Sequence, residues 1–582
     1  MSEHLVEVSS LSVTFPGEGA SDGVAAVRDL SFTLPRGGAL ALVGESGSGK
    51  SATASALLGL HRGSGARVEG LVRVAGVDVT AATEAELRAL RGARAAMVFQ
   101  DPLSSLDPYY AVGDQIAEVL RVHRKVTRRA ARARAVEALD RVGIPDAARR
   151  SRARPHEFSG GMRQRTLIAM ALACAPELLI ADEPTTALDV TVQAQILDLL
   201  HTLRREEGMG LLLVTHDVGV AAESVEDVLV MRDGRAVERG PAAEVLAAPR
   251  DTYTKALLEA VPRLDGPLKR PAGRATGTAG TGGPVADGSA AGVREAGEPL
   301  LEAVSLRREF GRGAKAVTAV DDVSLTVRRG ETLGIVGESG SGKTTLGRML
   351  VRLLEPTSGQ LRYGGTENGP GRASGARRGP GARRGPGGRG GDGGLGVQMV
   401  FQDPVASLNP RRSIGESIAD PLRAAGERDE RVLRARVREL LERVGLDPDR
   451  YDRYPHEFSG GQRQRVGIAR ALAPSPQLVV CDEPVSALDV TTQAQVIELL
   501  GELQRDLGLS LVFVAHDLAV VRQVSDRIVV MKDGRIVEQG DVSQVYDSPA
   551  DPYTQQLLAA VPTLDPVLAA VRRAARKELV DA

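Results

Sequence analysis

One phosphate-binding loop pattern occurs twice in this chain of 582 residues. GESGSGKS starts at Gly44 and GESGSGKT starts at Gly337, each directly after a short apolar segment (ALALV and TLGIV). A glycine-rich loop between a strand and a helix turns successive backbone N–H groups toward phosphate oxygens, and the helix dipole adds to the attraction. The duplication predicts two domains, because a chain of this length exceeds one compact core.

The same ordered motifs follow both loops. FQDP, SGG, a DEP that ends an apolar segment, and a THD or AHD occur in that order, and from SGG onward the copies are 300 positions apart, as between Asp182 and Asp482. The apolar segments before these motifs are short and hydrophobic on both faces, which is typical of strands in a parallel sheet covered by helices. Ligands bind at the carboxyl ends of such strands. The pattern therefore predicts an α/β fold with its site at that edge.

Composition argues against several classes of protein. The 74 Lys and Arg residues balance 75 Asp and Glu residues, and aromatic residues make up only 3% with no Trp, so neither charge nor stacking points to nucleic acid. Cys174 and Cys481 are too far apart in sequence to support a disulfide framework, a zinc site or an iron–sulfur cluster. We find no signal-peptide pattern and no apolar run of the ~18–20 residues that cross a bilayer, so we expect a soluble protein.

The domain organisation follows from the two copies. We predict a first domain at 1–265, a flexible Gly- and Ala-rich linker at 266–298, a second domain at 299–566 and a C-terminal helix at 567–582. Charged helical segments, about 109–151 and 411–451, interrupt each copy. The second copy also carries an Arg/Gly-rich insert at about 366–394, which we interpret as disordered and solvated; its six arginines would alternatively suit RNA or anionic lipid.

The motifs supply residues for binding and hydrolysing a nucleoside triphosphate. The loop lysine reaches the β- and γ-phosphates, and the hydroxyl after it, the FQDP glutamine and the strand-end aspartate can hold Mg²⁺. The next glutamate can polarise the attacking water, and the histidine one strand later can hold the phosphate and the base. As catalytic residues we predict Glu183, Glu483, His216, His516, Gln100 and Gln402. As metal-site residues we predict Ser51, Gln100, Asp182, Thr344, Gln402 and Asp482. As phosphate-binding residues we predict Gly44, Ser46, Gly47, Ser48, Gly49, Lys50, Ser51 and Ala52, with Gly337, Ser339, Gly340, Ser341, Gly342, Lys343, Thr344 and Thr345.

At the SGG triplets the sequence resembles a known superfamily. PHEFSGGMRQR (155–165) and PHEFSGGQRQR (455–465) look like the signature motif of ABC ATPases, and the Walker A, Walker B, Q-loop, D-loop (187–189 and 487–489) and H-loop motifs complete the set. The extended phrases FQDPLSSLDP and FQDPVASLNP, and the tails APRDTYTKALLEAVP and SPADPYTQQLLAAVP, are similar to the ATPases of oligopeptide, dipeptide, nickel and glutathione importers. The resemblance implies two tandem P-loop ABC-type ATPase domains, each with a parallel-sheet core, an inserted helical subdomain and a small antiparallel β subdomain.

The resemblance also implies a function and partners. It implies an ATP-hydrolysing, energy-coupling subunit of a membrane importer for peptides or related small solutes, with ATP and Mg²⁺ as cofactors. The implied partners are two transmembrane permease subunits and an extracytoplasmic solute-binding protein, with the chain peripheral at the cytoplasmic face of the inner membrane and no nucleic acid bound. Many relatives hold an iron–sulfur cluster on C-terminal cysteines; this chain has none there, so we expect no cluster.

Further nucleotide-binding residues follow from the same resemblance. The two copies are expected to pack head to tail, so that the signature triplet of each completes the phosphate site of the other. This adds Ser159, Gly160, Gly161, Ser459, Gly460 and Gly461 to the site. Phe15 and Phe310 match the adenine-stacking aromatic residue, with a buried strand phenylalanine as an equal alternative.

Two features leave alternatives open. Met162 stands where the signature usually has Gln, which predicts a weaker site there, and the Tyr-Thr tails either pack on their own domain or regulate it. A duplicated soluble ABC ATPase acting on ribosomes or nucleic acid is the alternative function. The short, breaker-rich linker disfavours this alternative, and only the arginine-rich insert supports it.

Overall fold

The structure, a computed structural model, describes residues 4–17, 23–186, 188–264, 298–311, 316–364, 366–367, 396–486 and 488–581. The linker apart from Glu298, the Arg/Gly-rich insert apart from residues 366–367, and the D-loop residues Ala187 and Ala487 lie outside the described residues. Contacts divide the chain into two units. Unit 1 comprises residues 1–261, 489–491 and 559–582, and unit 2 comprises residues 262–488 and 492–558. The domain boundaries given above remain predictions.

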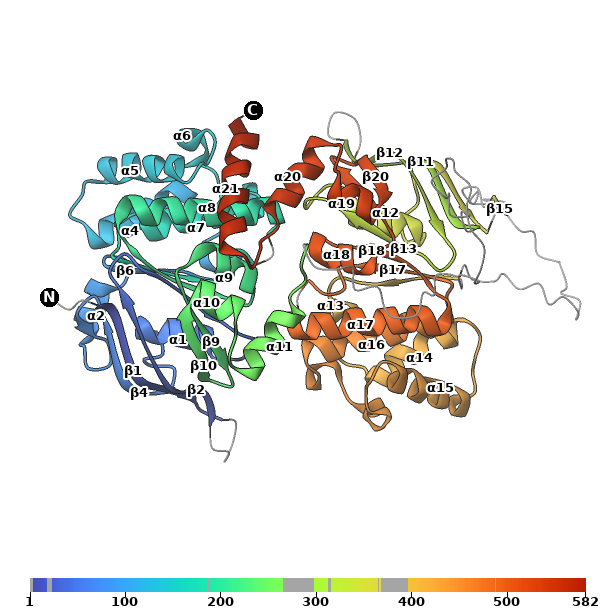
Figure 1. The fold of residues 1–582 in the computed structure, drawn as a ribbon, viewed down its shortest axis with the longest axis horizontal. Coiled ribbons are helices and arrows are strands. Elements are labelled where there is room, and N and C mark those ends of the chain that lie inside the picture. Colours follow the sequence, from blue (N-terminus) through green and yellow to red (C-terminus); the bar gives the residue numbers. More distant parts are fainter. Residues whose placement is uncertain are drawn as a thin grey trace, which may run out of the picture. The chain divides into compact units, whose positions relative to one another are not determined.

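Unit 1 contains an antiparallel sheet and a larger mixed sheet (Figure 1). The antiparallel sheet has the order β2 (Val24–Pro35), β1 (His4–Phe15), β4 (Arg67–Val74), β5 (Val77–Asp78). The mixed sheet has the order β10 (Arg235–Pro241), β9 (Asp227–Arg232), β3 (Ala39–Val43), β8 (Gly210–Thr215), β7 (Leu178–Asp182), β6 (Ala95–Val98).

The mixed sheet contains the predicted parallel strands and one antiparallel strand at its edge. Strands β9, β3, β8, β7 and β6 are parallel, but β10 pairs antiparallel with β9. All five residues of β3 are buried, as its continuous apolar sequence predicts. Since β3 lies between β8 and β9, with β7 next to β8, the ends of these strands bring the phosphate loop beside the DEP and THD motifs.

Helices cover the mixed sheet and form the inserted subdomain of unit 1 (Figure 1). Ala41 and Val43 contribute to one hydrophobic cluster, whereas Leu40 and Leu42 contribute to a second that includes the antiparallel sheet. Alternate residues of β3 thus serve opposite faces of the sheet. The helices are α1 (Lys50–Leu57), α2 (Glu84–Leu90), α3 (Pro102–Ser105), α4 (Val112–His123), α5 (Arg128–Arg141), α6 (Ala147–Arg150), η1 (Pro155–Glu157), α7 (Gly160–Leu172), α8 (Val190–Glu207), α9 (Val218–Ser224), α10 (Ala242–Ala247) and α11 (Thr252–Ala260).

Unit 2 repeats this plan. Its antiparallel sheet has the order β12 (Val317–Arg328), β11 (Pro299–Phe310), β14 (Ser358–Tyr363), β15 (Thr366–Glu367). Its mixed sheet has the order β16 (Val397–Val400), β17 (Leu478–Asp482), β18 (Ser510–Val514), β13 (Thr332–Val336), β19 (Arg527–Lys532), β20 (Arg535–Asp541). Its helices are α12 (Lys343–Leu350), α13 (Pro404–Ser407), α14 (Ile414–Ala424), α15 (Glu430–Arg443), η3 (Pro448–Asp452), η4 (Pro455–Glu457), α16 (Gly460–Leu472), α17 (Val490–Leu507), α18 (Leu518–Val524), α19 (Val542–Asp547) and α20 (Pro552–Ala560).

The C-terminal segment folds as part of unit 1. Helix α21 (Pro566–Asp581) packs against α9, and the backbone N–H of Thr563 donates to the carboxylate of Glu223 at 3.2 Å. That carboxylate is only 2% exposed, and Arg576 lies 3.7 Å from it. Arg573 and Arg576 each approach Asp198 at 3.2 Å. Burial raises the pKa of Glu223, and the arginines oppose this shift.

Candidate nucleotide site

The phosphate loop of each unit joins a central strand to a helix that begins at the loop lysine. In unit 1 the loop runs from the end of β3 to α1, whose N-cap, Gly49, has a φ of 95°. A Cβ at Gly49 would lie 2.3 Å from the carbonyl oxygen of Ala26, and one at Gly342 would lie 2.2 Å from that of Ala319. Both the left-handed backbone and the close approach therefore require glycine here.

The loop lysines lie inside the curled loops. Lys50 Nζ donates to the carbonyl oxygens of Gly44 and Glu45, both at 2.7 Å, and Lys343 Nζ donates to those of Gly337 and Glu338 at 2.8 and 2.7 Å. Burial lowers the pKa of Lys50, although the nearby Glu183 and Asp182 oppose the shift. Ser48 and Ser341 are also buried in the loops, whereas Ser46, Gly47, Ser339 and Gly340 are exposed.

A hydroxyl and a carboxylate meet next to each lysine. Ser51 Oγ donates to Asp182 Oδ1 at 3.0 Å, and Thr344 Oγ1 donates to Asp482 Oδ1 at 3.0 Å. Burial raises the pKa of both aspartates. These are the hard oxygen ligands that Mg²⁺ takes together with phosphate oxygens and waters, so the residues fit that ion. Within the ranges that the structure describes, no cluster of three or more His, Cys, Asp or Glu side chains could hold a metal.

The predicted catalytic residues converge on one carboxylate in each unit. Gln100 Nε2 donates to Glu183 Oε2 at 2.7 Å, and His216 Nδ1 lies 3.2 Å from Glu183 Oε1. In unit 2, Gln402 Nε2 donates to Glu483 Oε2 at 2.7 Å, and His516 Nδ1 lies 3.4 Å from the same oxygen. The structure thus brings together the three catalytic residues predicted for each copy.

The electrostatics of this group favour an ionised glutamate. Burial, the largest single influence, opposes ionisation of Glu183, but the hydrogen bonds from His216 and Thr186 and the charges of His216 and Lys50 together outweigh it, so the pKa of Glu183 is lowered. The hydrogen bond to Glu183 conversely raises the pKa of His216. In unit 2, burial again opposes both shifts, and the pKa of Glu483 is lowered while that of His516 is raised. An ionised carboxylate is in the protonation state that a proton acceptor requires.

Both of these glutamates have left-handed backbone conformations. The φ of Glu183 is 47° and that of Glu483 is 45°, and their N–H groups donate to the carbonyl oxygens of Val214 and Val514. A non-glycine residue in this region costs about 1–2 kcal/mol. The same strained conformation occurs at the same residue of both copies, where each carboxylate lies within reach of its histidine and glutamine partners.

This strain leads to a stability prediction. We expect Glu183→Gly to be more stable toward urea unfolding than Glu183→Ala by about 1 kcal/mol, because only glycine relieves the left-handed backbone and both changes remove the carboxylate. Glu137, exposed within helix α5, is the matched control. There the Ala variant should be the more stable, by about 1 kcal/mol. A Glu183→Ala variant at least as stable as the Gly variant would contradict the strain.

The signature serines cap helices. Ser159 Oγ accepts from Met162 N–H at the start of α7, and Ser459 Oγ accepts from Gln462 N–H at the start of α16. Gln462 also accepts from Ser459 N–H, which completes a capping box that Met162 cannot form. Gly160, Gly161, Gly460 and Gly461 form the first turns of these helices.

The aromatic candidates lie at strand ends. Phe15 ends β1 and packs edge-on against His61 at 5.2 Å between ring centroids; His61 Nε2 in turn pairs with the carbonyl oxygen of Ala52. Phe310 ends β11, is 42% exposed and has the Arg308 guanidinium over its ring. The exposure of Phe310 argues against the alternative that it is a buried strand phenylalanine. Stacking of adenine on Phe15 and Phe310 remains a prediction. Thr345 follows Thr344 on helix α12 and is partly buried.

Sequence reasoning missed two kinds of contact. Thr186 Oγ1 donates to Glu183 Oε2 at 2.9 Å, and the tyrosines of both Tyr-Thr tails contact the phosphate loops. Thr186 lies three residues after the glutamate, a spacing that could have indicated the contact. The tyrosines lie more than 200 positions from their loops in sequence, so the spacing of local motifs could not have predicted these contacts.

The chain is similar to known proteins along most of its length. Residues 27–186 and 320–486 match the ABC transporter family, and residues 237–282 and 537–580 match the oligopeptide/dipeptide transporter C-terminal region. The glutathione import ATP-binding proteins GsiA of Escherichia coli O157:H7 and Shigella dysenteriae serotype 1 are both 46% identical to the chain, over 97% of its length and 90% of theirs. Among solved structures, a dimeric post-hydrolysis state of the ATP-binding cassette MJ0796 bound to ADP and Pi is 27% identical, with a TM-score of 0.37, over 40% of this chain and 98% of that one.

Proposed function

Because this chain belongs to the ABC transporter family of ATP-binding proteins, we propose that it hydrolyses ATP to power a membrane importer of peptides or related small solutes. One observation carries the proposal: each unit places a glutamate that pairs with histidine and glutamine beside a phosphate loop. The relatives are named for glutathione, a tripeptide, which makes glutathione a candidate solute. The C-terminal match supports this function over action on ribosomes or nucleic acid.

The proposed chemistry assigns a role to each residue. The loop N–H groups and Lys50 bind the phosphates of ATP, and Ser51, Asp182 and Gln100 would hold Mg²⁺, which neutralises charge on the β- and γ-phosphates when bound. Glu183 accepts a proton from the attacking water, which adds to the γ-phosphorus as the bond to the β-phosphate oxygen breaks. The counterparts in unit 2 act in the same way.

We further propose that the two sites are composite. The triplet at 159–161 would complete the site of Lys343, and the triplet at 459–461 would complete the site of Lys50. Each serine caps a helix whose N-terminus offers N–H groups and a positive dipole end to a phosphate. ATP would then join the halves, and its hydrolysis would release them and move the membrane partners.

The proposed partners are two permease subunits and an extracytoplasmic solute-binding protein, at the cytoplasmic face of the inner membrane. Among the described helices, none has the length and apolar character needed to span a bilayer. We assign membrane attachment to the proposed permease partners.

Uptake of labelled glutathione tests the importer function. We expect cells of the source organism that lack this gene to lose ATP-dependent uptake of glutathione or of labelled di- and tripeptides, and the wild-type gene to restore it. The gene carrying Glu183→Gln and Glu483→Gln should produce the protein without restoring uptake. Unchanged uptake of all these solutes in the deleted strain would refute the importer function.

A further inference from the structure

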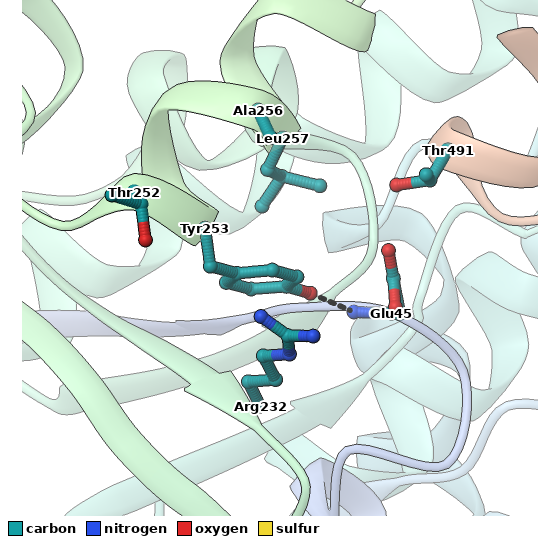
Figure 2. A pocket seen from close by; sticks show the side chains of 7 residues that line it. All are labelled: Glu45, Arg232, Thr252, Tyr253, Ala256, Leu257 and Thr491. Carbon is teal, nitrogen blue, oxygen red and sulfur yellow. Dashed lines mark hydrogen bonds between the residues drawn. The ribbon is translucent and has the colours of Figure 1, made fainter.

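Two equivalent tyrosines contact the starts of the two phosphate loops. The hydroxyl of Tyr253, in α11, accepts a hydrogen bond from the N–H of Glu45 at 3.2 Å (Figure 2), and the hydroxyl of Tyr553, in α20, accepts one from the N–H of Glu338 at 3.0 Å. Glu45 and Glu338 are the second residues of their loops. The contact therefore recurs in both units at matching positions.

The surroundings hold each ring in place. Tyr253 and Tyr553 are only 8% and 6% exposed. The carboxylate of Asp251 caps α11 by accepting from the Tyr253 N–H at 2.8 Å, and Asp551 does the same for Tyr553. A cation lies over each ring, Arg232 in unit 1 and Lys532 in unit 2, at 4.9 and 4.7 Å from the centroid. Both hydroxyls are thus directed at the loops by buried, capped and stacked side chains.

The tyrosine shares the second loop residue with the loop lysine. In unit 1, the Tyr253 hydroxyl accepts from the N–H of Glu45, and Lys50 Nζ donates to the carbonyl oxygen of Glu45 at 2.7 Å. In unit 2, Glu338 has the same two contacts. When ATP binds, the lysine must turn from these carbonyl oxygens toward the phosphates. Of these two contacts to the second loop residue, the hydrogen bond to the tyrosine then remains.

A pocket lies between α11 and the loop of unit 1. Its lining includes Glu45, Arg232, Thr252, Tyr253, Ala256 and Leu257 (Figure 2). The hydrogen bond between the Tyr253 hydroxyl and the Glu45 N–H joins the helix to the loop beside this pocket. Removal of the hydroxyl alone should loosen the loop while the ring stays in place.

We propose that Tyr253 and Tyr553 are positioning residues that keep the phosphate loop in its ATP-binding shape while the loop lysine moves to the phosphates. The inference rests on the proposed ATP binding at these loops. It assigns a task to the Tyr-Thr tails, which lie in the region that matches the oligopeptide/dipeptide transporter C-terminal region. Tyr253→Phe and Tyr553→Phe remove the hydroxyl groups and keep the rings.

The test combines nucleotide affinity with steady-state kinetics. In the full-length chain, the double variant Y253F/Y553F should raise the Kd for a fluorescent ATP analogue and the KM for ATP about fivefold, as the loss of one hydrogen bond to a preformed loop implies. The kcat should stay within about twofold, because the tyrosines do not touch the reacting atoms. Each single variant should weaken one of the two sites.

Tyr546 provides the matched control. It lies in α19 of the same region and is buried, but its hydroxyl donates to the carbonyl oxygen of Leu518, away from the loop. Y546F should lower the melting temperature without changing KM or Kd. Wild-type KM and Kd for Y253F/Y553F, or a change in melting temperature alone as in Y546F, would overturn the positioning role. If the wild-type chain itself failed to bind and hydrolyse ATP, the proposed function would fail instead.

Discussion

The double variant Glu183→Gln and Glu483→Gln is expected to hydrolyse ATP about 10²–10⁴-fold more slowly than the wild-type chain. Glutamine has nearly the same shape as glutamate and can still accept the bond from Gln100 or Gln402. Its amide cannot take a proton from water, so the loss falls on kcat. Binding of ATP should remain, since the loops and their lysines are unchanged. The measurements are phosphate release under saturating Mg-ATP and equilibrium binding of a fluorescent ATP analogue.

The single variants show whether both sites work. Both glutamates have the same histidine and glutamine partners and lowered pKa values, so each single change should reduce the rate. A single variant with the full wild-type rate would mean that its site is degenerate. Glu177→Gln is the matched control, because Glu177 precedes the same strand β7 at its opposite end and its counterpart in the second copy is Gln477. This control should hydrolyse ATP at the wild-type rate.

The second large effect concerns which serine completes which site. With head-to-tail sites, Lys343→Ala combined with Ser459→Asp should damage both sites, and the chain should bind no nucleotide tightly. Lys50→Ala combined with Ser459→Asp should damage one site only and leave about one tight nucleotide per chain. Aspartate can still cap helix α16, but its charge repels the γ-phosphate.

Titration with a non-hydrolysable ATP analogue distinguishes the arrangements. If each loop were completed by the triplet of its own copy, the two outcomes would be exchanged: Lys343→Ala with Ser459→Asp would keep one nucleotide, and Lys50→Ala with Ser459→Asp would keep none. The pair Lys343→Ala with Ser159→Asp serves as the internal control for head-to-tail sites. It should also keep one nucleotide. The exchanged pattern would contradict the composite sites.

Much of the core could be predicted from the sequence because it follows local rules. The apolar segment 39–43 is a buried strand, and the motifs after β3, β7 and β8 meet because parallel strands end at one edge of a sheet. The ABC-type α/β fold and its duplication are confirmed by the family match. The antiparallel β10 was not predicted, since no motif ends that strand.

The rest of the site depends on contacts that local patterns do not carry. The left-handed φ of Glu183 is unusual for glutamate, so its residue type gives no sign of it. The contact between Tyr253 and Glu45 joins residues 208 positions apart. Such contacts depend on how the helices after the sheet turn back over the loop, which single-sequence reasoning does not determine.

The packing of residues 559–581 on α9 has a consequence for biosynthesis. The buried carboxylate of Glu223 receives its bond from Thr563, which is translated 340 residues later. Domains generally fold as they emerge from the ribosome, N-terminal first. Unit 1 can acquire most of its structure early, but its last element arrives only after unit 2 has been made. A ribosome that stalls within the second half therefore leaves the first half unfinished as well.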